Sequence, residues 1–361
     1  MNANDTPDMS GYRWPAEWEP HAATWIAWPH NVETWPNRFA PIPSRFADII
    51  RALARFEPVH VLAGGEMVRR HAEEMLGGLP HVTLHDIPTN DVWIRDYGPT
   101  FLQGTTRPEV VAVDWQFNSW GGKYPPWDLD NSVGGHIARR LQIRRFSSQI
   151  VMEGGSIDGN GHGTVLTTRS CLLDPRRNRG VNPQRMEAWL RQYCCAREVI
   201  WIAGGPVAGD DTDGHVDQLA RFVSPHQVVV AVEDNPRDEN YEPLLTNLRM
   251  LQGYRNRYHE PLDVVRLPMP APIYFDNRRV PASYCNFYIA YRCVLVPMFD
   301  DPTDDTALRI LQPLFPDREL IGLPARDLVW GLGAIHCVTL QQPAPGNRSR
   351  ATEEVPRAGA R

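Results

Sequence analysis

The chain alternates amphipathic segments with short runs rich in Val and Ile. Apolar residues three or four positions apart, such as Leu244, Leu248 and Leu251, predict helices, and β-branched runs predict strands. The expected helices cover residues 66–76, 129–141, 183–193, 241–251 and 304–314. The expected strands cover residues 82–87, 110–115, 149–152, 164–168, 199–203, 227–232, 264–267, 293–298, 319–323 and 335–339.

These elements follow one another in the order helix, strand, strand, which is repeated five times. The helices begin at residues 66, 129, 183, 241 and 304, so that successive starts are 63, 54, 58 and 63 residues apart. A supersecondary unit that recurs at this spacing predicts a closed α/β fold with five units around an axis, although the residues themselves show no repeat. An open sheet built from successive α/β units is the alternative.

The chain of 361 residues is long enough to bury a large core. No Gly/Ser linker interrupts residues 1–343, so we expect them to form one domain. Residues 344–361 lack apolar spacing and are expected to be a disordered tail.

Composition and charge exclude several classes of protein. A net charge of -6 without a basic stripe excludes a nucleic-acid binder and suits a small cationic substrate. No apolar run has the length of about 20 residues that crosses a bilayer, and residues 1–10 lack the apolar core of a secretory signal, so we expect a cytoplasmic protein without membrane contact. Six cysteines are too few for a disulfide scaffold, and free thiols are expected.

Polar, mostly glycine-containing motifs fall between the two strands of each unit. They are residues 90–99 (NDVWIRDYGP), 153–156 (EGGS), 210–217 (DDTDGHVD), 283–286 (SYCN) and 331–337 (GLGAIHC). If the five units surround an axis, these loops meet at one end. The predicted pocket then contains Asp96, Glu153, His215, Asp217 and Cys337.

Each of these residues alone has a simpler explanation. Asp96 follows Arg95 and could form an ion pair or a turn. An isolated cysteine such as Cys337 is more often a small buried apolar residue than a nucleophile. His215 and Asp217 point the same way if their segment is extended, whatever their role.

Taken together, the residues favour chemistry on a guanidine. A guanidinium ion is planar and cationic and pairs with carboxylates, here Asp96 and Asp217. Its central carbon is deactivated by resonance and needs a strong nucleophile, which a Cys337 thiolate with a lowered pKa would supply. His215 would protonate the departing ammonia and then activate water, while Glu153 orients the imidazole.

Other functions use some of the same residues. A Cys-His protease needs the thiol and the imidazole but not two additional acids directed at the substrate. A zinc site formed by His215, Asp217 and another residue lacks support from HExxH or CxxC spacing, so no metal or other cofactor is expected. A noncatalytic protein that binds guanidines or polyamines remains an alternative.

At this point five stretches are recognisable. Residues 14–21 (WPAEWEPH), 93–99 (WIRDYGP), 153–156 (EGGS), 214–217 (GHVD) and 335–337 (IHC) resemble the agmatine deiminase family, which is related to bacterial peptidylarginine deiminase. The resemblance extends from about residue 11 to residue 343. It implies the five-bladed α/β propeller of the guanidine-modifying superfamily and hydrolysis of agmatine to N-carbamoylputrescine and ammonia, a step of polyamine biosynthesis, without a cofactor.

The resemblance also implies roles for individual residues. Cys337 matches the nucleophile that forms a covalent amidino-cysteine, and His215 matches the acid and base. Asp96 and Asp217 match the guanidinium ligands, and Glu153 matches the supporting acid. Trp93 and Asn286 are expected beside the substrate.

Four positions depart from the family pattern. Leu332 and Ala334 interrupt a segment that is usually GGGNIHC, Tyr97 replaces a common Thr, and Tyr291 replaces a frequent Asn. None removes a group from the proposed chemistry, but these loops border the pocket that recognises the far end of the substrate. Free or peptidyl arginine therefore remains an alternative substrate. The sequence does not fix the oligomeric state, and a homodimer is compatible with it.

Overall fold

The computed structural model describes residues 6–7 and 11–346. The predicted tail, residues 344–361, lies outside the described residues except for positions 344–346. The helices are α1 Ile42–Ala54, α2 Glu66–Leu76, α3 Ile94–Tyr97, α4 Ser119–Gly122, α5 Asp128–Leu141, α6 Arg169–Leu172, α7 Pro183–Cys194, α8 Tyr241–Gly253 and α9 Asp304–Leu311. Short 3-10 turns are η2 Val32–Thr34, η3 Gly154–Ser156, η4 Val216–Gln218, η5 Gln312–Leu314 and η6 Leu328–Gly331.

The strands of the described residues form five mixed sheets and one short hairpin, so the predicted mixed α/β class is confirmed. The first sheet contains β1 Tyr12–Arg13, β5 Thr100–Gly104, β6 Val110–Gln116 and β7 Arg145–Val151, and the second contains β8 Ile157–Gly159, β9 Thr164–Thr168 and β10 Glu198–Ile202. The third contains β11 Ala220–Ser224, β12 Gln227–Val232 and β13 Asp263–Pro268, and the fourth contains β16 Tyr288–Ile289, β17 Cys293–Met298 and β18 Glu319–Pro324. The fifth contains β19 Leu340–Pro343, β2 His21–Ala27, β3 Val59–Leu62 and β4 Val82–His85, and the hairpin is β14 Tyr274–Phe275 with β15 Arg278–Arg279.

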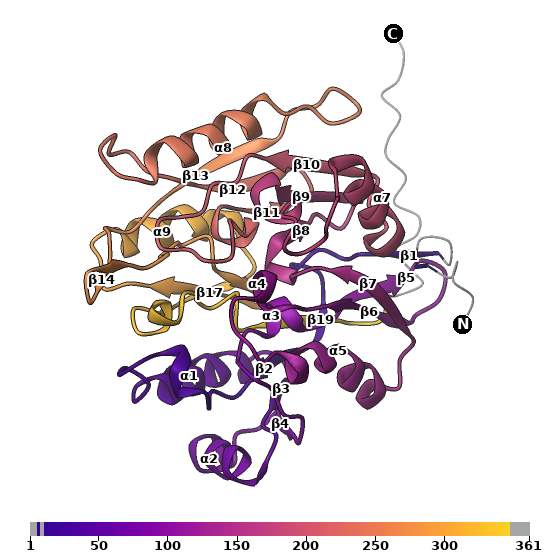
Figure 1. Cartoon of the computed structure of the whole chain (residues 1–361), viewed down its shortest axis with the longest axis vertical. Helices are drawn as coiled ribbons and strands as arrows, with labels where there is room; N and C mark the ends of the chain where they lie inside the picture. The colour runs from indigo at the N-terminus through magenta and orange to yellow at the C-terminus, as the bar shows by residue number, and fades with distance from the viewer. Residues whose placement is uncertain (1–5, 8–10, 347–361) are drawn as a thin grey trace.

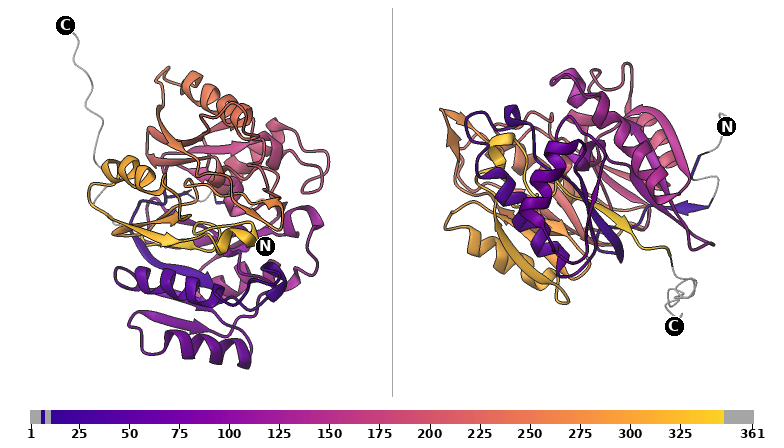
Figure 2. Two further views of the ribbon diagram at one scale, coloured as in Figure 1. Left: turned by 90° about the vertical axis from the view of Figure 1, so that its left-hand side faces the viewer. Right: turned by 90° about the horizontal axis from the view of Figure 1, so that it is seen from below.

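All five sheets share one plan. An antiparallel pair such as β5 and β6 is followed by a helix and then by a strand parallel to the second member, here α5 and β7. The corresponding helices of the other sheets are α7, α8, α9 and α1. In the fifth sheet the antiparallel partner, β19, comes from the far end of the chain, so that it lies beside the N-terminal β2 (Figure 2).

The predicted elements mostly lie where they were expected, but their grouping into units is wrong. β9, β12 and β17 have the predicted bounds, whereas the two strands of a predicted unit, such as β7 and β9, lie in different sheets. The predicted helix 66–76 is α2, which follows β3 and is not the helix equivalent to α5. The prediction omits α1, β2 and β3, although Phe46, Ile49, Ile50 and Leu53 of α1 are buried at helical spacing.

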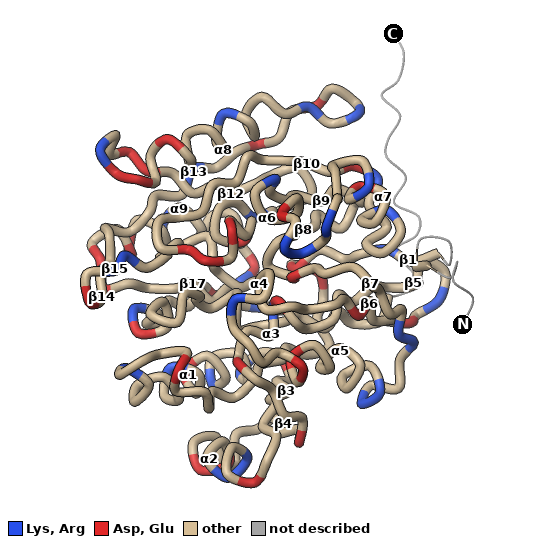
Figure 3. The backbone as a smooth tube through the Cα atoms, viewed as in Figure 1, with Lys and Arg blue, Asp and Glu red and all other residues tan. Residues whose placement is uncertain are grey.

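The apolar residues of the sheets and helices form two clusters, the larger of which contains the fully buried Trp25, Trp28 and Trp35. All six cysteines are free and buried, as expected. Among the described helices, none combines the length and apolar character needed to span a bilayer. Acidic and basic residues are interspersed over the view in Figure 3.

The five polar motifs occupy equivalent places in this fold. Each one directly precedes the first strand of an antiparallel pair, namely β5, β8, β11, β16 or β19. Figure 1 draws α1, α5, α7, α8 and α9 around the outside and the short α3 and α4 near the middle. Loops far apart in the sequence are therefore placed where their side chains can meet.

Candidate active site

Cys337 lies in a turn before β19, so the predicted strand 335–339 is wrong. The backbone N–H groups of His336 and Cys337 donate to Asn286 Oδ1 at 3.1 and 3.4 Å, and Thr339 Oγ1 donates to the carbonyl of Ile335 at 2.9 Å. These hydrogen bonds between backbone and side-chain atoms take the place of backbone pairing with a neighbouring strand. The apolar residues of the segment are buried because the turn itself is buried. The Cys337 sulfur lies 3.3 Å from Asn286 Nδ2 and 3.8 Å from Asp217 Oδ2.

Three predicted site residues meet around Gly155. A Cβ atom at this glycine would lie 2.8 Å from Asp96 Oδ1, 2.8 Å from His215 Nδ1 and 3.0 Å from Asp217 Oδ2. The structure therefore brings together the acids, the imidazole and, through Asp217, the thiol. His215 and Asp217 do not converge by strand alternation, because residues 216–218 form the turn η4.

Gly155→Ala is expected to lower kcat/KM by about 100-fold, because the added methyl group must displace Asp96, His215 or both from their present positions. Gly253→Ala is the matched control, since a Cβ at Gly253 meets nothing within 4 Å. The activities of both variants are compared after their thermal unfolding has been measured. Full activity of the Gly155 variant would mean that the packing around this residue does not set the site geometry.

Asp96 is held by two donors. Its Oδ1 accepts from the backbone N–H of Gly155 at 3.0 Å, and its Oδ2 accepts from the indole of Trp120 at 2.9 Å. Trp120 belongs to α4, where residues 119–122 all have positive φ, a conformation that turns the indole toward the carboxylate. Burial, together with Asp217 and Glu153, raises the pKa of Asp96 to about 6.

His215 lies between two acids. Its Nδ1 is 3.6 Å from Asp96 Oδ1, and its Nε2 is 3.9 Å from Glu153 Oε2. Burial alone would lower the pKa of this imidazole, but Asp96, Cys171 and Glu153 raise it well above its usual value. Neither ring nitrogen has a hydrogen-bond partner within the described part of the chain, although both are buried.

Glu153 is fully buried and binds Arg177, a residue that the sequence analysis does not single out. The Arg177 Nε lies 2.9 and 2.8 Å from the two oxygens of Glu153. Burial opposes ionisation of Glu153, but Arg177 and His215 lower its pKa below the usual range. Glu153 is therefore ionised, and its charge is shared between the Arg177 guanidinium and the His215 imidazole.

Among the described residues, Glu153, Cys171 and His215 form a group that could hold a metal ion. Their ligand atoms all lie within 4.8 Å of one another. A metal ion in this position would have to compete with Arg177 for both oxygens of Glu153. The alternative zinc site of the sequence analysis, His215 with Asp217, is not this group of ligands.

Asp217 and His336 belong to a second buried network. His336 Nδ1 is 2.7 Å from Asp217 Oδ2, and His336 Nε2 is 2.9 Å from Glu17 Oε2. Burial would raise the pKa of Asp217, but His336, His215 and Arg221 lower it. The second oxygen, Asp217 Oδ1, is buried and has no hydrogen-bond partner among the described residues.

The predicted lowered pKa of Cys337 is wrong for the protein without a ligand. Burial, Asp217 and Asp96 raise the pKa of this thiol well above its usual value. Two carboxylates disfavour a thiolate as strongly as they favour a cation. The predicted thiolate therefore requires a positive charge between these acids.

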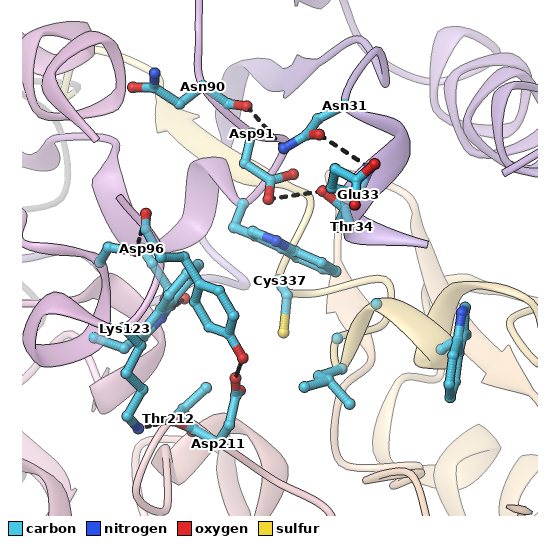
Figure 4. Close-up of a pocket in the computed structure, with 18 of the residues that line it drawn as sticks. Asn31, Glu33, Thr34, Asn90, Asp91, Asp96, Lys123, Asp211, Thr212 and Cys337 are labelled. Atoms are coloured by element: carbon cyan, nitrogen blue, oxygen red, sulfur yellow. Dashed lines mark hydrogen bonds between the residues drawn. The ribbon is translucent and has the colours of Figure 1, made fainter. Parts of the chain in front are cut away.

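A cavity of about 540 Å³ opens onto Cys337, Asp96 and Trp93. Figure 4 shows the Cys337 sulfur directed into this cavity, with Asp96, Lys123 and Asp211 around it. Asp217, His215, Glu153 and Asn286 are not among the lining residues. Asn286 lies against the thiol, so its predicted contact with the substrate stays a prediction.

The four residues that depart from the family pattern differ in how deeply they are buried and in whether they line the cavity. Leu332 lines the cavity with φ +72°, a left-handed conformation that costs a non-glycine residue about 1 kcal/mol. Ala334 is fully buried, and Tyr97 is buried and donates to the carbonyl of Asp91 at 2.9 Å. Tyr291 is exposed. Of the four, Leu332 alone lines the cavity.

Known proteins match this chain over nearly its full length. The model of the Porphyromonas-type peptidyl-arginine deiminase family matches residues 13–343. Agmatine deiminases of Pseudomonas syringae pv. tomato and Pseudomonas aeruginosa are 36% and 37% identical, and each alignment covers 95% of this chain and at least 98% of the relative. The structure of agmatine deiminase of Enterococcus faecalis superposes with a TM-score of 0.90 at 30% identity, covering 95% of this chain and 99% of that one. The chain therefore belongs to the Porphyromonas-type peptidyl-arginine deiminase family.

Proposed function

We propose that this chain is a hydrolase that converts agmatine to N-carbamoylputrescine and ammonia through a covalent amidino-cysteine at Cys337. The observation that carries the proposal is the meeting of Asp96, His215 and Asp217 around Gly155, with the Cys337 sulfur 3.8 Å from Asp217. The similarity to agmatine deiminases over 95% of the chain supports the same activity.

The guanidinium group of the substrate binds between Asp96 and Asp217. The buried Asp217 Oδ1 lacks a partner among the described residues, and a buried carboxylate oxygen without a donor is costly unless a ligand supplies one. Asp96 supplies the second carboxylate. The incoming cation offsets the charge of both acids, and the Cys337 thiol then releases its proton to solvent.

In the first half-reaction the thiolate attacks the central carbon of the guanidinium ion, forming a neutral tetrahedral adduct. Protonated His215 donates its proton to one amino group, the C–N bond breaks, and ammonia leaves a cationic amidino-thioether. In the second half-reaction neutral His215 accepts a proton from the attacking water. The C–S bond then breaks, the carbonyl of the urea product forms, and the thiolate recovers a proton.

Alkylation of the free protein tests the charge state of the thiol. Because the pKa of Cys337 is raised, iodoacetamide is expected to label it more slowly at pH 7 than it labels a cysteine peptide, and the rate should rise only as alkaline pH produces the thiolate. Mass spectrometry of the peptide containing Cys337 measures the rate. Rapid labelling at neutral pH without a ligand would contradict the charge assignment.

The substrate is tested by ammonia release from agmatine, arginine and a blocked arginine peptide. We expect agmatine to have the highest kcat/KM, because the relatives that match 95% of the chain are agmatine deiminases. The cavity lining itself has mixed charge, with Glu33, Asp91 and Asp211 beside Lys123, Arg278 and Arg279. A preference for arginine would identify a deiminase for another guanidine. Calorimetric binding without any ammonia release would identify a noncatalytic binder.

We further propose that residues 1–343 form a single domain in which the five sheets are the blades of a propeller. The shared order of antiparallel pair, helix and parallel strand supports this arrangement, as does the pairing of β19 with β2, which joins the two ends of the chain. Closure of that kind places the five motif loops at one end of the axis. A crystal structure would test the arrangement of the blades.

A further inference from the structure

We propose that His336 is a positioning residue that directs one oxygen of Asp217 toward the substrate and restrains the other. The inference rests on the proposed function, because it assigns the guanidinium group of the substrate to Asp217 Oδ1. Its geometric basis is a continuous buried chain of contacts from Asp217 through His336 to Glu17, with distances of 2.7 and 2.9 Å.

Each ring nitrogen of His336 faces one carboxylate oxygen. The two atoms that face the ring are carboxylate oxygens, which only accept hydrogen bonds when they are ionised. Burial opposes ionisation of Glu17, but Arg221 and His336 lower its pKa well below the usual range, and the pKa of Asp217 is also lowered. The ring lies between two carboxylates and contacts each of them through one nitrogen, at 2.7 and 2.9 Å.

The hydrogen bond to His336 gives the two oxygens of the Asp217 carboxylate different surroundings. Oδ2 is held by His336 Nδ1, whereas Oδ1 is buried without a partner among the described residues. Without His336, the carboxylate would be free to rotate and offer either oxygen, or neither, to the guanidinium. Fixed in this way, Oδ2 stays 3.8 Å from the Cys337 sulfur, and Oδ1 stays at one defined place as an acceptor without a partner among the described residues.

Glu17 is held in place by residues of three elements, β11, β16 and α3. Arg221 of β11 lies 2.9 Å from Glu17 Oε1, and the backbone N–H of Ile289 in β16 donates to the same oxygen at 2.8 Å. Arg95 of α3 donates to Glu17 Oε2 at 3.3 Å. Glu17, Arg95, Arg221 and His336 are all buried, and a small cavity of about 30 Å³ lies against Glu17, Arg95 and His336.

Two amide substitutions separate the two contacts of the ring. The amide nitrogen of asparagine reaches about the place of Nδ1, and that of glutamine reaches about the place of Nε2. His336→Asn should keep the bond to Asp217 and retain kcat/KM within about tenfold, whereas His336→Gln should lose about 100-fold because Asp217 is released. A merely structural role predicts similar losses or a larger one for His336→Asn, and either result would overturn the inference.

Binding of n-butylguanidine, measured by calorimetry in the full chain, separates this inference from the proposed function. Its Kd should rise strongly in His336→Gln and little in His336→Asn. If this order holds but the wild type releases no ammonia from agmatine, the proposed function alone fails. If the wild type is active and both variants bind n-butylguanidine equally, the positioning role fails.

A structure of Cys337→Ser with n-butylguanidine keeps the inference testable even if a His336 variant does not fold. The guanidinium should contact Asp217 Oδ1 while His336 stays on Oδ2. A guanidinium that displaces His336 from Oδ2, or that does not contact Asp217, would overturn the inference.

Discussion

Replacing Cys337 by serine is expected to lower kcat for ammonia release from agmatine by about 10⁴-fold or more, while the protein still folds and binds its substrate. A serine hydroxyl fits the buried position, but it is a much weaker nucleophile than a thiolate. The sulfur lies beside Asp217 and Asn286, neither of which can replace its attack on carbon. Initial rates and agmatine binding by calorimetry, both on purified protein, provide the measurement.

The matched control for this prediction is Cys194→Ala. Cys194 is a buried cysteine at the end of α7, in the smaller apolar cluster and away from the cavity. This variant should retain ammonia release close to that of the wild type. An active Cys337→Ser protein would exclude covalent catalysis at residue 337.

Asp96→Asn is expected to lower kcat/KM by about 100-fold or more. The substitution removes one of the two charges that hold the guanidinium, and the loss of one partner of a buried charge pair typically costs about 2–5 kcal/mol. It also removes the carboxylate that keeps the pKa of His215 raised, which weakens the acid needed for ammonia release. Asp234→Asn, at a side chain that is 78% exposed, is the control.

The pH dependence of the wild type gives the same carboxylate a second test. The pKa of Asp96 is raised to about 6, so this group is ionised at pH 7 and becomes neutral as the pH falls through that value. The kcat/KM of the wild type should therefore fall on the acid side of pH 6. In Asp96→Asn this loss should disappear. An unchanged acid limb in the variant would assign the titration to another group.

The long elements of the fold are predictable from the sequence, and its grouping into sheets is not. The amphipathic spacing in α8 and the Val-rich run of β12 identify these elements within two residues. Short strands such as β8 and β16, with three and two residues, contain too little alternation to be recognised. β8 and β16 begin two of the antiparallel pairs, and β5 and β11, which begin two others and have five residues each, are also absent from the prediction. The predicted units are therefore shifted against the sheets.

Some residues of the candidate site are likewise predictable from the sequence, and others are not. Asp96, Glu153, His215, Asp217 and Cys337 are predictable because each lies in a polar motif at an equivalent place in the chain. Trp120 and Arg177 act through contacts made only in the folded protein, with Asp96 and Glu153 respectively. Glu17 and His336 lie within the recognised stretches, so a signal for them was present, but their pairing joins residues 319 positions apart.

The most direct test of the central claim is rapid acid quenching of the wild type during turnover of agmatine, followed by mass spectrometry of the digested protein. Part of the enzyme should carry an amidino adduct on the peptide that contains Cys337, and this adduct should form and decay at rates that account for ammonia release. Ammonia release without any adduct at Cys337 on this time scale, or an adduct on Cys171 or Cys285 instead, would contradict the account.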